Sequence, residues 1–188
     1  PHALVASAVM LVRGGPLADR MGAPMSLVYT AEGQPADVEA ELDQVRTRLQ
    51  RHGAPAFVDL ETPGSTLWAE WVGQPLTEPD AQLVRAGMPV KALGPVIGAS
   101  LPSMLDGRDL LLDLANGHLF VREGLDVKAM RRVLHPHDGY AVVLRRSPSA
   151  PDAEIDRWGY APDGQRMMDA IKDRWDPQRR FNPGAFVV

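Results

Sequence analysis

The stretch HPHDGY, at positions 135–140, brings two imidazoles and a carboxylate into one short segment. Such groups are common ligands of zinc and iron, so His135, His137 and Asp138 are the first candidates for a metal site. Pro136 extends the chain between the two histidines, however, and the Asp-Gly pair favours a tight turn. We therefore interpret the stretch as an exposed turn and predict that it holds no metal.

Sequence motifs for nucleotide binding and nucleophilic catalysis are absent. Neither GxGxxG nor GxxxxGK[ST] occurs, so the sequence predicts no loop that cradles nucleotide phosphates. Ser100 in GASLP lacks the second glycine of a nucleophile elbow, because Pro102 stands at that position. The chain has no cysteine, which excludes a disulfide, a thiolate metal site and a catalytic thiol.

The composition points to an ordinary globular domain. The chain has 188 residues, which is enough for one domain with a core of its own. Its net charge of −4 argues against nucleic acid as a partner, because nucleic acids select concentrated basic surfaces. Seventeen arginines accompany only three lysines. The guanidinium fork suits carboxylate and phosphate, but a GC-rich genome would give the same bias, and we favour this compositional interpretation.

The opening run ALVASAVMLV is apolar over ten residues. A membrane-spanning helix needs about 20 such residues, and a signal peptide would carry a basic segment before them. The run therefore predicts a buried strand over residues 4–12. Because the chain starts with Pro1 and not with methionine, we expect it to be a processed or cloned fragment.

The elements that follow in the first half are two more strands with a helix between them. Residues 25–31 predict the second strand, and residues 54–61 predict the third. The helix between them has apolar residues at helical spacing and ends at a glycine. Its expected buried side chains are Val38, Leu42, Val45 and Leu49.

The middle of the chain gives weaker signals. A short helix is expected to bury Trp68 and Trp71 on one side. Prolines and glycines cluster in residues 73–98, which predicts an irregular segment with one helical turn near 80–85. A further strand is expected over residues 96–101.

The second half contains the clearest turn and cap signals. Asn116-Gly117 stands between two apolar runs, which predicts a β-hairpin, and Asp126 is a suitable N-cap for a short helix. Residues 140–146 predict a strand. The last helix is marked by Met168, Ile171 and Trp175. This order of elements predicts an α+β fold: a mostly antiparallel sheet with helices packed on one face.

The last sixteen residues, DRWDPQRRFNPGAFVV, end on three apolar side chains. Left in water, each would forgo roughly 1.5–3 kcal/mol of burial, so the tail is expected to dock on something. Together with the preceding helix it reads IKDRWDPQRRFNPGAF. This segment resembles the C-terminal signature of FAD-linked oxidases of the vanillyl-alcohol-oxidase type, roughly IKxxxDPxGxxNPG.

Within that family, the second half is most similar to the FAD-binding subunit of bacterial glycolate oxidase. The similarity lies in LANGHLFVREGLDVKAMRRVLHPHDGYAVVLRR and the following IDRWG. It implies that residues 1–188 are a single cap, or substrate, domain, the C-terminal fragment of a longer flavoprotein. The tail, residues 176–188, would then dock on an N-terminal flavin domain that binds most of the FAD.

The resemblance also implies site residues. Asn182 and Gly184 of the NPG motif are expected to contact the cofactor, since the proline after Asn182 keeps it extended and its amide can donate and accept together. Arg145 and Arg146 are candidates for a clamp on the substrate carboxylate, with surface salt bridges as the alternative. No catalytic residue is identified.

The function implied is oxidation of a small 2-hydroxy acid, glycolate to glyoxylate, with hydride transfer to FAD. The expected partners are the flavin-binding domain and other glycolate oxidase subunits, namely a second flavoprotein and an iron–sulfur subunit. The expected location is cytoplasmic, with peripheral contact at the inner membrane face through those subunits. Two alternatives stay open: a stand-alone module that binds a small acid or a protein, and a non-catalytic structural subunit. Tyr140, which replaces the histidine of a family GGHA motif, permits the second alternative.

Overall fold

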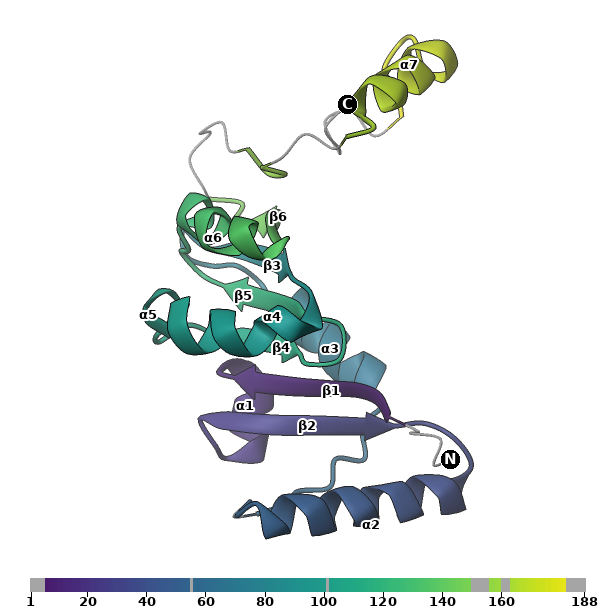
Figure 1. Ribbon diagram of the computed structural model, residues 1–188, viewed down its shortest axis with the longest axis vertical. Coiled ribbons are helices and arrows are strands. Elements are labelled where there is room, and N and C mark those ends of the chain that lie inside the picture. Colours follow the sequence, from purple (N-terminus) through teal and green to yellow (C-terminus); the bar gives the residue numbers. More distant parts are fainter. Residues whose placement is uncertain (1–5, 55, 101, 150–155, 160–162, 182–188) are drawn as a thin grey trace.

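The computed structural model of the chain describes residues 6–54, 56–100, 102–149, 156–159 and 163–181 (Figure 1). Its strands are β1 (Ala6–Arg13), β2 (Met25–Ala31), β3 (Gln82–Gly87), β4 (Leu110–Asp113), β5 (His118–Arg122) and β6 (Tyr140–Arg146). Its helices are α1 (Gly15–Met21), α2 (Pro35–Arg51), α3 (Gly64–Gly73), α4 (Val90–Pro95), α5 (Pro102–Leu105), α6 (Val127–Leu134) and α7 (Gln165–Trp175). A π-helical segment η1 (Val96–Ser100) and a 3₁₀ segment η2 (His135–His137) extend α4 and α6.

The six strands form one sheet in the order β2-β1-β4-β5-β3-β6. Every paired set of neighbours is antiparallel. The predicted α+β class with an antiparallel sheet is therefore confirmed. Strands β4 and β5 lie in the middle of the sheet, so this hairpin joins β1 and β2 to β3 and β6.

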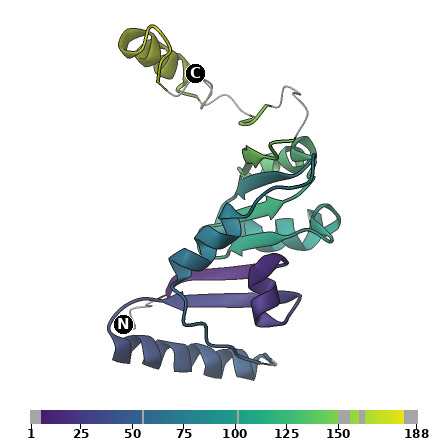
Figure 2. The same cartoon turned by 180° about the vertical axis from the view of Figure 1, so that it is seen from behind.

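The helices cover both faces of the sheet, whereas the sequence predicted them on one. On one face, α4, η1, α5 and α6 pack on the first core cluster, which includes Leu110 and Leu112. On the other face, α1 and α3 pack on a second cluster, which includes Leu111 (Figure 2). Successive residues of a strand point to opposite faces. The run Leu110-Leu111-Leu112 thus presents apolar side chains on both faces of the sheet, and helices must pack on each face to bury them.

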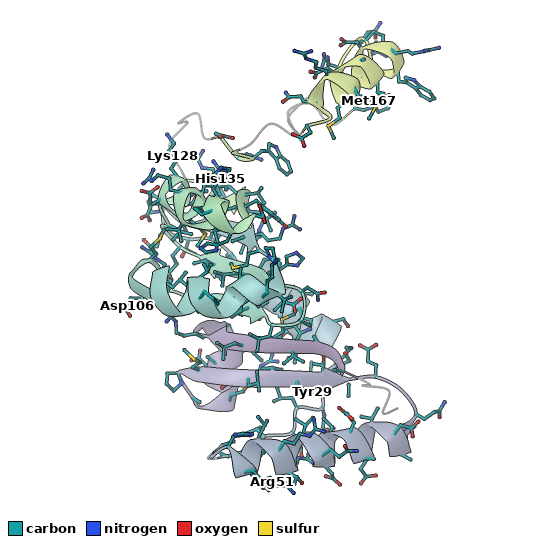
Figure 3. The ribbon with its side chains drawn as sticks, in the orientation of Figure 1. Tyr29, Arg51, Asp106, Lys128, His135 and Met167 are labelled. Carbon is teal, nitrogen blue, oxygen red and sulfur yellow. The ribbon has the colours of Figure 1, made fainter. Side chains whose placement is uncertain are left out.

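The predicted elements at the N-terminus are close to the observed ones. Strand β2 has the predicted bounds, and α2 has the predicted apolar stripe. The four stripe residues are only half-buried, however, because α2 lies beyond the edge strand β2 and not over a sheet face (Figure 1). The hydroxyl of Tyr29 donates to Glu41 Oε1 at 2.6 Å, between β2 and α2 (Figure 3). Burial and this carboxylate raise the pKa of Tyr29 to about 12.

Three predictions for the middle of the chain are wrong. Residues 56–61 are irregular, not a strand, and link α2 to α3. Residues 82–87 form β3, not a helical turn, because β5 and β6 flank them on both sides. The stretch 96–100 is helical, not a strand, and Val96 faces the core three residues after Leu93. Short apolar runs fit either a strand or a buried helix, and tertiary partners decide between them.

The local signals of the second half are confirmed. The hairpin turn follows Asp113, whose carboxylate accepts from the backbone N–H of Ala115 at 2.9 Å and of Asn116 at 3.0 Å. Asp126 caps α6 by accepting from Ala129 N–H at 2.9 Å. Strand β6 has the predicted bounds.

Candidate functional site

The main candidate site is a pocket where three loops meet. It lies between the β1–α1 loop, the α1–β2 turn and the loop that enters β4, and its volume is about 540 Å³. The last of these loops follows Asp106, at the edge of the molecule in Figure 3. The lining residues are Arg13, Gly14, Ala18, Asp19, Gly22, Ala23, Pro24, Gly107, Arg108 and Asp109. We call it the Asp109 pocket.

The Asp109 carboxylate lies directly over the backbone of Gly14. A Cβ built at Gly14 would come 1.7 Å from Asp109 Oδ1, so any side chain there would force the Asp109 carboxylate to move. Gly14 also has φ 69° and ψ 176°, a conformation that is essentially restricted to glycine. The stretch Arg13-Gly14-Gly15-Pro16, which the sequence marked only as a loop, is thus shaped to receive a carboxyl group.

Burial raises the pKa of Asp109 above its usual range. The neighbouring Asp19 raises it further, while Arg122, Arg13 and the Gly15 N–H act in the opposite direction. Within the described part of the chain, Asp109 forms no salt bridge. A half-buried carboxyl that is not neutralised by an ion pair is available to a ligand.

Two arginines shape the rim of the Asp109 pocket in different ways. Arg13 binds the backbone of the loop before β4, since its Nε donates to the Arg108 carbonyl at 2.9 Å and its Nη2 to the Leu105 carbonyl. Within the described residues, Arg108 donates through its Nε alone, to the Met104 carbonyl at 2.9 Å. Its two terminal nitrogens have no partner among the described residues, so the end of the guanidinium fork is free to bind a ligand.

Two further arginines, Arg122 and Arg145, hold the C-terminal end of α3. Arg122 is buried and donates to the carbonyls of Trp71, Gln74 and Pro75, at 3.0, 3.3 and 2.7 Å. Arg145 donates to the carbonyls of Val72 and Gln74, the latter at 3.0 Å. The last carbonyls of a helix lack partners within the helix, and cations are favourable there. These contacts therefore fix α3 against β5 and β6.

The two candidates for the carboxylate clamp, Arg145 and Arg146, are neighbours on β6. The β3–β6 register shifts between Leu83 and Val84, so β6 contains one extra residue, and Arg145 lies on the face that carries α3. Arg146 is the next residue of the strand and pairs with Gln82, on the opposite face. The backbone therefore directs the two side chains to opposite faces of the sheet, and the clamp stays a prediction.

The other candidates from the sequence lie elsewhere. His135 and Asp138 line a second pocket, of about 680 Å³, together with Arg131, Tyr140 and Trp158. Within the described residues, no three metal-ligating side chains gather at one point. Ser100 belongs to η1. Asn182 and Gly184 lie outside the described residues, so their contact with a cofactor stays a prediction.

The residues just before the NPG motif form an ordered turn on α7. The Asp176 carboxylate accepts from the backbone N–H groups of Arg180 and Phe181, at 2.8 and 2.9 Å, and pairs with Lys172 at 2.8 Å. The Lys172 ammonium and these N–H groups lower the pKa of Asp176 to about 2. The DPQRRF stretch is thereby folded back against the end of α7.

The predicted last helix is confirmed, but its apolar side chains are not buried. Figures 1 and 2 show α7 apart from the sheet, and Figure 3 labels Met167 upon it. Met167 is 65% exposed, Ile171 53%, Trp175 78% and Phe181 69%. An apolar surface of this kind is typical of an interaction site.

Comparisons with known proteins do not assign the chain to a family. No protein-family model matches it, and a search of curated proteins finds no significant relative. Among the described residues, no helix has the length and apolar character needed to cross a membrane.

Substituting Gly14 by alanine tests the geometry of the pocket. We expect Gly14→Ala to destabilise the chain by at least 1 kcal/mol more than Gly22→Ala, in line with the roughly 1–3 kcal/mol cost of a strained backbone residue. Both glycines have positive φ, but a Cβ at Gly22 meets nothing within 4 Å. Urea unfolding of the two variants measures the difference. Equal losses of stability would mean that Asp109 moves aside freely.

Proposed function

We propose that this chain is the cap, or substrate, domain of an FAD-dependent 2-hydroxy-acid oxidoreductase that converts glycolate to glyoxylate. The support is the resemblance of the C-terminal segment to the signature of FAD-linked oxidases, together with the exposed apolar surface beside it. The proposal includes a cytoplasmic enzyme, which meets the inner membrane face only through partner subunits.

The observation that carries the proposal is the exposure of apolar side chains on α7. A helix with Met167, Ile171 and Trp175 exposed on it gains little from its own domain, since packing of an apolar face supplies most helical stability. The signature-bearing turn follows at once and is fixed by Asp176. In the proposed enzyme this surface, the α7 docking surface, packs on the flavin-binding domain and brings Asn182 to the cofactor.

The described residues would not form a complete FAD site by themselves. Trp175 and Phe181 suit an apolar domain surface, whereas a dinucleotide also needs donors for its phosphates. The other domain would therefore hold most of the cofactor. Bound FAD would accept the hydride from the substrate carbon. This chain would cover the flavin face and supply groups that orient the hydroxy acid.

The test compares two exposed apolar residues in the flavoprotein encoded by the complete reading frame. Trp175 lies on the α7 docking surface, and Val90, 49% exposed, lies on α4. We expect Trp175→Ser to reduce the FAD retained after gel filtration at least several-fold, while Val90→Ser retains the wild-type amount. In the 188-residue chain alone, neither change should lower the melting temperature appreciably, because neither side chain is buried there.

Three results would contradict the proposal. The reading frame could lack a flavin-binding half, or the purified protein could show no flavin absorbance. A loss of melting temperature in the isolated chain on Trp175→Ser, with flavin retention unchanged, would make α7 a structural element of this domain alone.

A further inference from the structure

The second pocket, beside the HPHDGY stretch, is not used by the proposed function. It lies where the end of α6, the η2 turn, the start of β6 and residues 156–159 meet, and its volume is about 680 Å³. Cavities of about 300–1,000 Å³ are usual for small organic ligands. We call it the Trp158 pocket. His135, labelled in Figure 3, lines it together with the side chains of Arg131, Arg132, Asp138, Tyr140 and Trp158.

The wall of the pocket that carries Trp158 is held in place by Arg131. The Arg131 Nε donates to the Ala141 carbonyl of β6 at 2.8 Å. Its Nη2 donates to the carbonyls of Asp156 and Arg157, both at 3.0 Å. The Arg157 carbonyl also accepts from a backbone N–H of β6 at 2.9 Å. Residues 156–159 therefore lie along the edge strand of the sheet, fixed to both α6 and β6.

A tight turn fixes the backbone around Trp158. Asp156 Oδ1 accepts from the backbone N–H of Trp158 at 3.1 Å and from that of Gly159 at 2.6 Å. Gly159 has φ 75°, and a Cβ there would come 2.0 Å from Arg131 Cζ. The backbone of Gly159 thus lies directly against the Arg131 guanidinium group. These backbone contacts position Trp158 at the wall of the pocket.

A second aromatic side chain, Tyr140, lines the same pocket. Its phenol ring lies over the backbone of Gly87, since a Cβ at Gly87 would come 2.5 Å from Tyr140 Cε1. The guanidinium carbon of Arg85 lies 5.7 Å from the centre of the ring, which is a cation–π contact. Because these contacts hold the ring, Tyr140 and Trp158 offer a planar ligand two aromatic side chains at defined positions.

The charged groups of the Trp158 pocket differ in whether they have partners. The Arg131 guanidinium is occupied by the contacts above and pairs with Asp156 Oδ2 at 3.3 Å. Arg132 is exposed, and its guanidinium has no hydrogen bond or ion pair within the described part of the chain. Such a fork matches the two oxygens of a carboxylate. The exposed imidazole of His135 adds a further hydrogen-bond donor, and Asp138 adds one negative charge.

We propose that the Trp158 pocket binds a planar aromatic carboxylate. The aromatic ring packs on Trp158 and Tyr140, and the carboxylate pairs with the Arg132 guanidinium. Asp138 disfavours a second negative charge on the ligand, so a singly charged carboxylate should bind better than a phosphate monoester. The pocket is separate from the Asp109 pocket and from the α7 docking surface, and the inference does not rest on the proposed function.

Calorimetric titration of the 188-residue chain with 2-naphthoate tests the inference. We expect saturable binding at one site. Arg132→Gln should weaken it about tenfold, because a charge-assisted hydrogen bond is lost. Trp158→Leu should weaken it at least about threefold, because the side chain stays apolar but the aromatic contact is lost. Lys128→Gln is the matched control, since Lys128 is exposed on the same helix outside the pocket, and it should bind as the wild type does (Figure 3).

Three analogues of the probe test each part of the recognition. The uncharged 2-naphthamide should bind about tenfold more weakly, because it cannot form the ion pair with Arg132. The saturated analogue, decahydro-2-naphthoate, keeps the charge and loses the aromatic ring, and should bind at least about threefold more weakly. The third, 2-naphthyl phosphate, should not bind more tightly than 2-naphthoate.

Four results would overturn the inference. They are the absence of saturable 2-naphthoate binding, unchanged binding by the Arg132 and Trp158 variants, equal binding of either of the first two analogues, and tighter binding of the phosphate. Thermal melting checks that the variants fold. Where Trp158→Leu lowers the melting temperature, Trp158→Phe is used instead, and it should retain most of the affinity because it keeps a ring.

The exposed apolar side chains of α7 are the other surface on which an aromatic acid could bind. Trp175→Ser separates the two surfaces, since it should leave 2-naphthoate binding unchanged, and a loss of binding would move the site to α7 and overturn the inference. The same variant tests flavin retention in the complete flavoprotein. Flavin retention that depends on Trp175, without 2-naphthoate binding, would keep the cap domain and reject the Trp158 pocket, and the reverse result would do the opposite.

Discussion

Replacing Trp71 with alanine should lower the free energy of unfolding by about 3–5 kcal/mol, the usual cost of removing a large buried aromatic side chain. Trp71 is 1% exposed and lies in the second core cluster, where it packs α3 on the sheet with Leu83 and Leu111. The guanidinium carbon of Arg122 lies 5.7 Å from the centre of its ring. The substitution removes both the packing and this cation–π contact.

Urea unfolding of the 188-residue chain measures the effect, and Trp68→Ala is the matched control. Trp68 lies on the same helix but is only half-buried at the border of the cluster, so its loss should cost clearly less. A cost for Trp71→Ala no greater than that for Trp68→Ala would mean that α3 can shift to fill the space. The indole N–H is buried without a partner among the described residues, so its removal offsets part of the packing loss.

Replacing Arg122 with methionine should cost about 2–4 kcal/mol, because one buried and two part-buried carbonyls lose a charged donor, and an unsatisfied buried group costs ~1–3 kcal/mol. Methionine keeps much of the apolar stem and removes the fork. Arg122 is 6% exposed and serves three carbonyls at the end of α3. Burial lowers the pKa of its guanidinium, and Asp109 partly offsets this effect.

Arg145→Met is the matched control for Arg122→Met. Arg145 reaches the same end of α3, at the carbonyls of Val72 and Gln74, but from an exposed position. Water can replace an exposed donor, so we expect Arg145→Met to cost less than about 1 kcal/mol. Equal costs for the two variants, measured by urea unfolding, would contradict the assignment of Arg122 as the main support of the helix end.

The elements predicted well from the sequence are those whose signals are local. The helical spacing of Val38, Leu42, Val45 and Leu49, the Asn116-Gly117 hairpin and the Asp126 cap each depend on a few neighbouring residues. Periodicity and capping act over one or two helical turns or across a single hairpin. The same reasoning predicted the bounds of β2 and β6.

Which apolar side chains are buried, and which residues meet at the candidate site, depends on contacts between residues far apart in the sequence. The apolar stripe of α2 is half-buried because the helix lies beyond a sheet edge, and the apolar residues of α7 are exposed. Nothing local distinguishes such a stripe from one that faces a core, since the same spacing serves both.

The sequence by itself determined the α+β class, the Asn116-Gly117 hairpin and the absence of cysteine chemistry and of known nucleotide-binding loops. Only the tertiary structure placed helices on both faces of the sheet and brought Gly14, Trp71 and Asp109 together. These three residues come from the β1–α1 loop, α3 and the loop before β4, so their meeting depends on the strand order β1-β4-β5-β3. Strand order depends on the total apolar surface buried by many contacts between distant residues. A short stretch of sequence contains no information about those contacts.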